Sequence, residues 1–249
     1  MINLRDIPCE APLQLSFTPG RSKRLVVSLA GVGNNRRQMP PAEFARTAHW
    51  NGENNVLFVS DLSRSWLNGP GMAQFVADAV KAVAAEIDAD AICAVGNSMG
   101  GTSALILASL MHIDHVVAIT PQFSAKPGVV PEETRWMYFR ERVADWPFPE
   151  VPDLRHTDSE ITILHGGSPD ELAHALRFPA DAGYWHYIFP NQGHLLARNL
   201  HQEDLLAPIV TLSLLGRTLR ARRAVRLAGG MSRHRFDHLH LSSHSPRRH

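Results

Sequence analysis

The sequence predicts an α/β fold with a mostly parallel central sheet and helices on both of its faces. Short apolar, β-branched runs alternate along the chain with segments whose apolar residues recur every three or four positions. Strands that alternate with helices pair in parallel, because each helix serves as a crossover between two strands. Several strand candidates are nearly continuous apolar runs, which is typical of strands buried on both faces.

The strand candidates are residues 13–17, 24–29, 55–60, 90–95, 115–119, 161–164 and 185–189. Helical spacing of apolar residues predicts helices over 71–88, 100–110 and 169–176, and a largely helical segment over 195–215. We see no internal repeat and no change of composition that would divide this part of the chain. We therefore expect one domain over residues 1–216.

One long excursion interrupts the alternation of strands and helices, between Pro121 and Glu160. Pro131 suits a first helical turn, and Trp136 and Phe139 would then lie on one face of that helix. An insertion of about 40 residues between two strands is usually a lid or a binding element. We expect residues 121–160 to form a partly helical lid.

The charge of the chain is unevenly distributed. The net charge is +1, yet residues 217–249 contain nine Arg, five His and a single acidic residue, Asp237. Few large apolar side chains accompany them, so we expect a basic, disordered tail. A specific nucleic-acid partner is not expected.

Nothing in the sequence indicates a metal centre, a cofactor or a membrane span. Cys9 and Cys93 make neither a disulfide framework nor a cluster of metal ligands. No stretch approaches the ~18 unbroken apolar residues that cross a bilayer, and the first ten residues lack a signal-peptide pattern. We expect a cytoplasmic enzyme without cofactor or metal, and its oligomeric state stays open.

The motif that points to chemistry is Gly96-Asn97-Ser98-Met99-Gly100, which fits G-x-S-x-G. It follows a buried strand directly and opens a helix rich in Ala, Leu and Ile. This strand–turn–helix setting is what a nucleophile elbow requires, because the chain must reverse sharply and expose the serine oxygen. We predict that Ser98 is the nucleophile. The alternative is a glycine-rich structural turn with an incidental serine.

A serine hydroxyl needs a base, and the base needs an acid that orients it. His194 follows the last strand and opens the terminal helical segment, so we predict that it is the base. The acid is expected on the loop after the 161–164 strand, where Asp170 fits best. Asp170 also suits a helix start, and Glu171 is the reserve candidate.

Two backbone N–H groups should stabilise the oxyanion of an acyl-transfer reaction. We expect one from Met99, directly after the nucleophile, and one from Val32, in the loop after the 24–29 strand. Strand-end residues that are candidates for substrate binding are Gly31, Arg36, Trp66, Gln122 and Phe123. Trp136 and Trp146 of the lid would supply an apolar or sugar-stacking wall, or simply the core of the lid.

Taken together, the elbow, the Gly31 loop and the order Ser98, Asp170, His194 resemble the α/β-hydrolase superfamily over about residues 12–216. The resemblance implies an eight-stranded, mostly parallel sheet and chemistry through an acyl-enzyme. Ala30 stands where the family usually has His before the oxyanion-loop glycine, and the backbone does the work there.

The first functional hypothesis is a serine hydrolase that cleaves a small-molecule carboxylic ester or thioester. The second is an acyltransferase that uses the same three residues, with a saccharide among its possible acceptors. The third is a non-catalytic binding protein that keeps the fold, since fold alone does not determine function. A serine at position 98 argues against dehalogenase or epoxide hydrolase chemistry, which requires an acid at that position.

Overall fold

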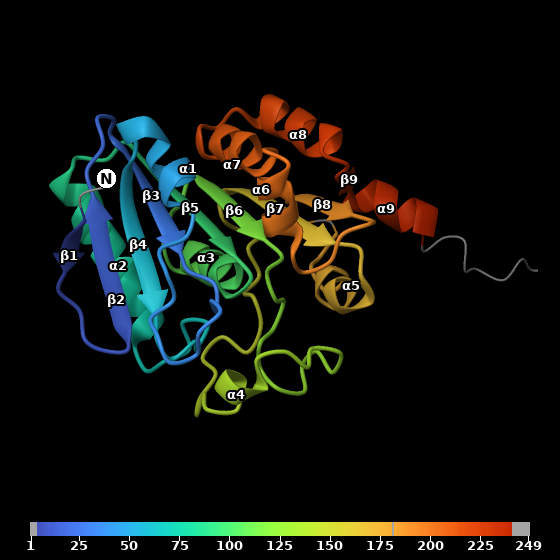
Figure 1. Cartoon of the computed structure of the whole chain (residues 1–249), viewed down its shortest axis with the longest axis horizontal. Coiled ribbons are helices and arrows are strands. Elements are labelled where there is room, and N and C mark those ends of the chain that lie inside the picture. The colour runs from blue at the N-terminus through green and yellow to red at the C-terminus, as the bar shows by residue number, and fades with distance from the viewer. Residues whose placement is uncertain (1–3, 181, 241–249) are drawn as a thin grey trace, which may run out of the picture.

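The computed structural model describes residues 4–180 and 182–240, and within them one sheet contains nine strands (Figure 1). The strand order is β1-β2-β4-β3-β5-β6-β7-β8-β9. The strands are β1 (Arg5–Ile7), β2 (Leu13–Thr18), β3 (Arg24–Leu29), β4 (Asn55–Asp61), β5 (Ala91–Asn97), β6 (His115–Ile119), β7 (Glu160–Gly166), β8 (Trp185–Phe189) and β9 (Met231–Ser232). Strands β3 to β8 pair in parallel, and β1, β2 and β9 are antiparallel additions at the two edges.

The register of the parallel strands gathers their carboxyl ends along one edge of the sheet. Leu29 at the end of β3 pairs with Gly96 in β5, and Asn97 at the end of β5 pairs with Ile119 at the end of β6. The loops that follow these strands therefore meet. Ligands of open α/β sheets bind outside the carboxyl ends of the strands, which makes this edge the place to look for a site.

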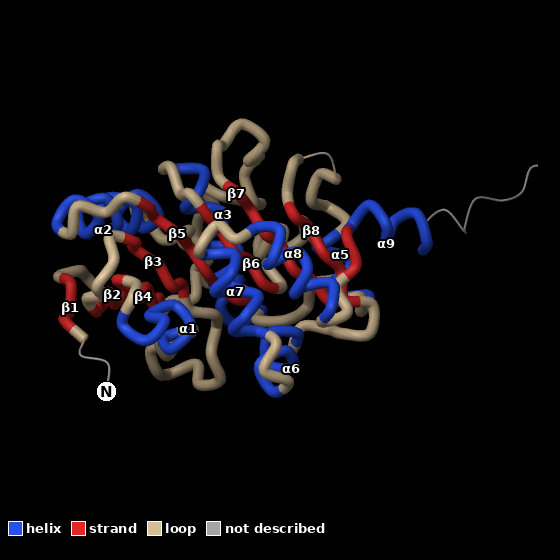
Figure 2. Tube along the Cα trace, turned by 90° about the horizontal axis from the view of Figure 1, so that it is seen from above, coloured by secondary structure: helices blue, strands red, loops and turns tan. Residues whose placement is uncertain are grey.

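Helices cover both faces of the sheet, as the strand–helix alternation predicts. They are α1 (Ala45–His49), α2 (Met72–Glu86), α3 (Met99–Leu110), α4 (Met137–Arg140), α5 (Pro169–Ala175), α6 (Leu196–Gln202), α7 (Leu206–Leu214), α8 (Thr218–Leu227) and α9 (Arg233–His240), with a short 3₁₀ turn at Trp50–Gly52. Figure 2 shows α2 and α3 on one side of the strands and α1, α6 and α7 on the other. Alternate strand residues fill the two cores, so Val27 packs toward α2 and α3 while Val26 packs toward α1 and α7. Among the described residues, no helix combines the length and apolar character needed to cross a bilayer.

The lid lies at the carboxyl edge of the sheet, at the bottom of Figure 1, but the predicted helix through its middle is wrong. Only the four residues of α4 are helical, and Trp136 just before them has a positive φ of 62°. The side chain of Arg140 is almost fully buried and donates to the main-chain oxygens of Ala125, Glu133 and Arg135. One buried guanidinium thus satisfies main-chain oxygens of a lid segment that has little regular secondary structure.

The expectation of a disordered tail is wrong for residues 217–240, which form α8, β9 and α9; residues 241–249 lie outside the described residues. Helix α8 is amphipathic and buries Ala221 and Val225. Strand β9 pairs with β8, and Phe236 of α9 is buried against Ala175 and Ile188. A few well-spaced apolar side chains therefore suffice to offset the cost of ordering this arginine-rich segment.

Deletion of residues 229–249 is expected to lower the melting temperature by about 5–10 °C. The deletion removes the buried Phe236 ring, and loss of a core Phe side chain costs about 3–5 kcal/mol. It also removes Arg233, whose Nη1 donates to the Ala175 carbonyl at the end of α5, 2.5 Å away. Thermal unfolding of the truncated chain measures this, with a chain that ends after His240 as control. Equal melting temperatures would show that β9 and α9 contribute nothing to stability.

Candidate active site

Ser98 lies at the tip of a tight turn between β5 and α3, with φ 55° and ψ −120°. Glycine is required on both sides of it by close approach of the backbone. A Cβ atom on Gly96 would lie 2.2 Å from the carbonyl carbon of Gly100, and one on Gly100 would lie 2.1 Å from the Leu29 oxygen. A non-glycine residue with positive φ is strained, and the surrounding contacts hold it in place. The local conformation is the one that the G-x-S-x-G pattern predicts.

A continuous chain of hydrogen bonds connects Ser98, His194 and Glu171. His194 Nε2 lies 3.0 Å from Ser98 Oγ, and His194 Nδ1 lies 2.8 Å from Glu171 Oε1. The three residues come from the β5–α3 turn, the loop after β8, and the first turn of α5. Ser98 and Glu171 are buried, whereas the His194 side chain remains 17% exposed.

The carboxylate that contacts His194 is Glu171 and not Asp170, which corrects the sequence-based expectation. The Asp170 side chain is 44% exposed, accepts a hydrogen bond from Ser168 Oγ at 2.5 Å and pairs with Arg135 at 3.2 Å. Neighbouring helical residues point about 100° apart, so only one of the two carboxylates can face the sheet. Glu171, His174 and Ala175 form the buried face of α5. Their spacing of three and four residues was the available signal.

Two loops pack closely enough to bring α5 against His194. The N–H of Gly167 donates to the Phe189 and Gln192 oxygens, both at 2.8 Å. A Cβ atom on Gly167 would lie 2.6 Å from the Pro190 oxygen, so a larger residue would push the two loops apart. The glycines after β7 therefore fix the distance between the acid and the base.

The surroundings of Glu171 favour its ionised form. Burial by itself would raise the pKa of Glu171, but the hydrogen bond from His194 and the charges of His165, His194 and Arg135 outweigh it and hold the pKa below its usual value. An ionised carboxylate at this position can fix the imidazole tautomer that carries its proton on Nδ1.

Gln122 contacts Ser98 directly. The sequence predicts Gln122 only as a candidate for substrate binding, not as a partner of the nucleophile. Its Nε2 lies 3.0 Å from Ser98 Oγ, and its Oε1 accepts from the Trp66 indole N–H at 3.1 Å. An indole N–H is only a donor, so this bond fixes the amide orientation and makes Nε2 the donor to Ser98. The hydroxyl proton of Ser98 is then left to point toward His194.

The loop after β3 is held by two ionisable side chains, one on each side. The carboxylate of Glu43 accepts the N–H of Gly31, and the Arg64 Nε donates to the Val32 oxygen at 3.1 Å. Arg64 is fully buried, and its remaining donors bind the main-chain oxygens of Leu62, Asn35 and Gln38. Val32 packs in one cluster with Met99, the first residue of α3. The first N–H groups of a helix have no partner within it, so Met99 can offer its N–H to a ligand.

Glu43 is expected to make stability fall as the pH rises. Burial raises the pKa of Glu43 to about 7, and the hydrogen bond from Gly31 offsets this rise only in part. The folded protein thus retains a proton that the unfolded chain releases at lower pH, so the unfolding free energy decreases between about pH 4.5 and 7. In Glu43→Gln this decrease disappears. The melting temperature of the variant minus that of the wild type should therefore be about 2–6 °C larger at pH 8 than at pH 5.

Melting curves at the two pH values test this, with Glu203→Gln as a matched exchange at an exposed position. The control should keep the same difference from the wild type at both pH values. If Glu43→Gln behaves like the control, then Glu43 does not titrate in this range.

Other predicted substrate residues have different surroundings. Phe123 is partly buried, packs edge-on against Phe178 at the margin of the core, and its N–H donates to His174 Nδ1 at 3.1 Å. Arg36 stacks over Tyr138 of the lid and lines a cavity of about 630 Å³ between the lid and the β4–α2 loop. That cavity is bounded by Phe139, which packs in the cluster of Met99, Trp66 and Val32.

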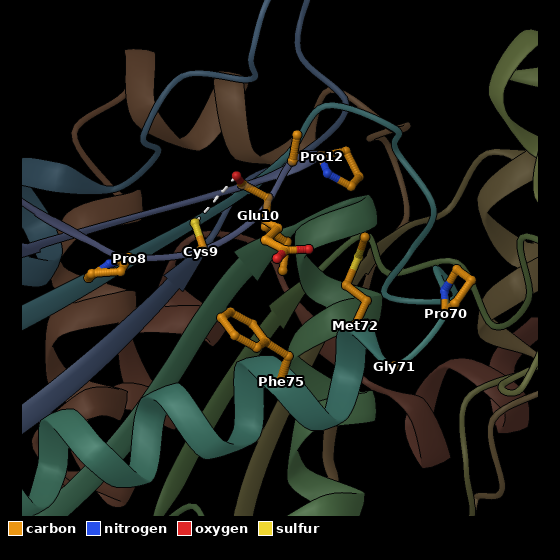
Figure 3. A pocket seen from close by; sticks show the side chains of 10 residues that line it. Pro8, Cys9, Glu10, Pro12, Pro70, Gly71, Met72 and Phe75 are labelled. Atoms are coloured by element: carbon orange, nitrogen blue, oxygen red, sulfur yellow. Dashed lines mark hydrogen bonds between the residues drawn. The ribbon is translucent and has the colours of Figure 1, made fainter.

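A second cavity, of about 530 Å³, lies next to the first and is shown in Figure 3. Pro12, Pro70 and Met72 border both cavities, and Cys9 and Phe75 line the second alone. Neither lining includes Ser98 or His194. The link between this pair of cavities and the hydrogen-bonded chain is Phe139, which lines the first cavity and packs in one cluster with Trp66 and Met99.

The lid tryptophans gather near the elbow. Trp136 and Trp146 pack against the cluster formed by Val32, Trp66, Met99, Ala125 and Phe139. An apolar wall next to the nucleophile suits an acyl group or the face of a sugar. Across the described ranges, no group of three or more His, Cys, Asp or Glu is placed to hold a metal ion.

No known protein-family model and no curated protein matches the sequence. Solved structures are similar to it. An esterase of Pyrococcus furiosus is 15% identical over 87% of this chain and 91% of its own, with a TM-score of 0.61. The capsule O-acetyltransferase of Neisseria meningitidis serogroup A is 11% identical over 83% of this chain and 95% of its own, with a TM-score of 0.57. An acylaminoacyl peptidase of Pyrococcus horikoshii is 11% identical over 84% of this chain and 40% of its own, with a TM-score of 0.61. The strand order and these similarities confirm that the protein has the α/β-hydrolase fold.

Proposed function

We propose that the protein is a serine hydrolase that cleaves a carboxylic ester or thioester through an acyl-enzyme intermediate. The observation that carries this proposal is the chain of hydrogen bonds from Glu171 through His194 to Ser98, at 2.8 and 3.0 Å. A nucleophile, a base and an orienting acid within hydrogen-bond reach are the signature of covalent acyl transfer.

In the proposed reaction, His194 Nε2 takes the Ser98 hydroxyl proton while Oγ attacks the carbonyl carbon. The protonated imidazole is stabilised by Glu171, which remains ionised. The N–H groups of Met99 and Val32 are assigned to the oxyanion that forms on the carbonyl oxygen. Collapse of this intermediate breaks the bond to the alcohol or thiol, which leaves with the proton from His194. A water molecule, activated by His194, then attacks the acyl-enzyme and releases the acid.

Gln122 adds a donor that ordinary serine hydrolase chemistry does not require. Its Nε2 lies 3.0 Å from Ser98 Oγ, which lies at the same distance from His194 Nε2. This bond stabilises negative charge on Oγ as the proton leaves, because an N–H donor binds an anionic oxygen more strongly than a neutral one. We assign Gln122 to activation of the serine rather than to recognition of substrate.

An acyltransferase with the same residues is the second candidate. Ser98 is only 4% exposed beneath a lid that carries two tryptophans, which restricts access of water to an acyl-enzyme. The similarity to a capsule O-acetyltransferase over 83% of the chain is compatible with this alternative.

Turnover of p-nitrophenyl butyrate and of butyryl-CoA tests the proposal. A rapid burst of one p-nitrophenol per protein chain, followed by slower turnover, supports an acyl-enzyme. Adding an alcohol or saccharide acceptor then separates the two candidates. A transferase passes the acyl group to the acceptor, so the new ester forms and less butyrate is released. With a hydrolase, the fraction of acyl groups released as butyrate does not change. Absence of both burst and turnover in the wild type argues for a non-catalytic protein.

A further inference from the structure

Arg135 of the lid binds the acid of the proposed triad. Its Nη1 donates to Glu171 Oε1 at 3.0 Å. The same oxygen accepts the hydrogen bond from His194 Nδ1. Among the described residues, nothing donates to Glu171 Oε2, which is buried. Arg135 and His194 therefore share one carboxylate oxygen, and the two bonds together set the orientation of Glu171.

A second buried carboxylate, that of Glu133 in the lid, fixes the position of Arg135. The Nε and Nη2 of Arg135 donate to both oxygens of Glu133, whose side chain is 1% exposed. Glu133 also accepts from His174 Nε2 at 3.0 Å. The Nδ1 of His174 accepts the N–H of Phe123, so its proton lies on Nε2 and points toward Glu133.

These contacts bridge two parts of the fold that are separate in sequence. Glu133 and Arg135 belong to the insertion between β6 and β7, whereas Glu171 and His174 belong to α5. Arginine suits this position because its planar fork can engage two carboxylates at once, which lysine cannot do with the same geometry.

We propose that Arg135 is a positioning residue that couples docking of the lid to the orientation and charge of Glu171, so that the triad is complete only while the lid is seated. The inference rests on the proposed function. A lid that moved away would withdraw the guanidinium and leave Glu171 with His194 as its remaining hydrogen-bond donor. Access to Ser98 and readiness of the triad are thereby linked through one side chain.

The charge of Arg135 has a predictable effect on pH dependence. The groups facing Glu171 are His194 from the β8 loop, His165 from β7, Arg135 from the lid, and beyond them Asp170 and Glu133. The positive charge of Arg135 helps to hold the pKa of Glu171 below its usual value, so Glu171 stays ionised to lower pH. Removal of this charge should move the acidic limb of the kcat/KM profile to higher pH by about half to one unit.

Arg135→Gln and Arg135→Lys test the proposal, with Glu132→Gln as control. Glu132 forms an exposed ion pair with Arg177 between the lid and α5 at 3.5 Å, without touching the triad. We expect Arg135→Gln to lower kcat about tenfold, as for coupled residues of one network, and to shift the acidic limb. Arg135→Lys should restore the acidic limb but only part of kcat. Glu132→Gln should change neither.

A third variant separates positioning from simple loss of folding. Arg135→Gln leaves the buried Glu133 charge without its main partner, which costs stability. The double variant Glu133→Gln, Arg135→Gln removes that charge. If it regains the melting temperature of the wild type but keeps the lowered kcat, Arg135 acts on Glu171 as proposed. If both return to wild-type values, Arg135 serves only the stability of the lid and the proposal fails.

A readout independent of turnover distinguishes this failure from failure of the proposed function. The Nδ1 proton of His194, bound to Glu171, is expected as a downfield proton resonance that is lost in His194→Ala. The pH at which this resonance titrates should rise in Arg135→Gln and not in Glu132→Gln. An unchanged titration overturns the proposal even in an active enzyme, and a shifted one supports it even where no ester is turned over.

Discussion

Ser98→Ala should lower kcat/KM for p-nitrophenyl butyrate by about 10⁴-fold or more, the largest effect expected of any single substitution. The substitution removes the nucleophile, and only binding and oxyanion stabilisation then remain. His194→Ala should cost nearly as much, because a serine without its base is a poor nucleophile. The two substitutions together should cost no more than either alone, because residues that act as one unit are not additive.

Initial rates with matched melting temperatures measure this effect. Ser109→Ala is the control, because Ser109 lies on the same helix and its hydroxyl donates only to the Ile106 oxygen. It should keep the wild-type rate. If Ser98→Ala retains more than about a tenth of the activity, Ser98 is not the nucleophile. If the double variant is far slower than both single ones, the residues do not act as one unit.

Glu171→Gln should lower kcat by about 10²–10⁴-fold, whereas Asp170→Asn should change it less than threefold. The amide of Gln keeps the shape of the side chain but removes the charge that stabilises the imidazolium, and it does not enforce the reactive tautomer. Asp170 is half exposed and bonded to Ser168, so its charge matters little to the imidazole.

The pair is a matched test, since the two residues are adjacent on α5 and each exchange removes one carboxylate charge. Steady-state kinetics across pH 5–9 with melting curves measures both. A large loss in Asp170→Asn together with a small loss in Glu171→Gln would return the role of the acid to Asp170. It would mean that the loop after β7 rearranges when substrate binds.

The backbone of the site could be predicted because its signals are local. The elbow needs small residues at 96 and 100 and a strand and a helix around them, and all of these are visible along the sequence. His194 follows from its place after the last parallel strand. Strands β3, β6 and β8 begin and end where their apolar runs do. Periodicity and turn chemistry determine such features without reference to distant parts of the chain.

The contacts that the sequence does not predict depend on residues far apart along the chain. The choice between Asp170 and Glu171 is made by the rotation of α5 against β8, and the role of Gln122 by its hydrogen bond from Trp66. Arg135 reaches Glu171 across 36 positions. The arginine content of the tail predicts disorder, yet Ala221 and Val225, one turn apart on α8, and Phe236 on α9 pack this segment against the domain. Composition averages over the few residues that decide packing.

Mass spectrometry after reaction with a fluorophosphonate probe tests the acyl-transfer proposal most directly. Such a probe forms a covalent bond only with a serine whose hydroxyl is activated by a neighbouring base. We predict one adduct per chain, located on the peptide that contains Ser98, absent from Ser98→Ala and formed at least 10²-fold more slowly in His194→Ala. An unmodified wild-type protein, or an adduct on any other serine, would contradict the assignment of Ser98, His194 and Glu171 as an acyl-transfer site.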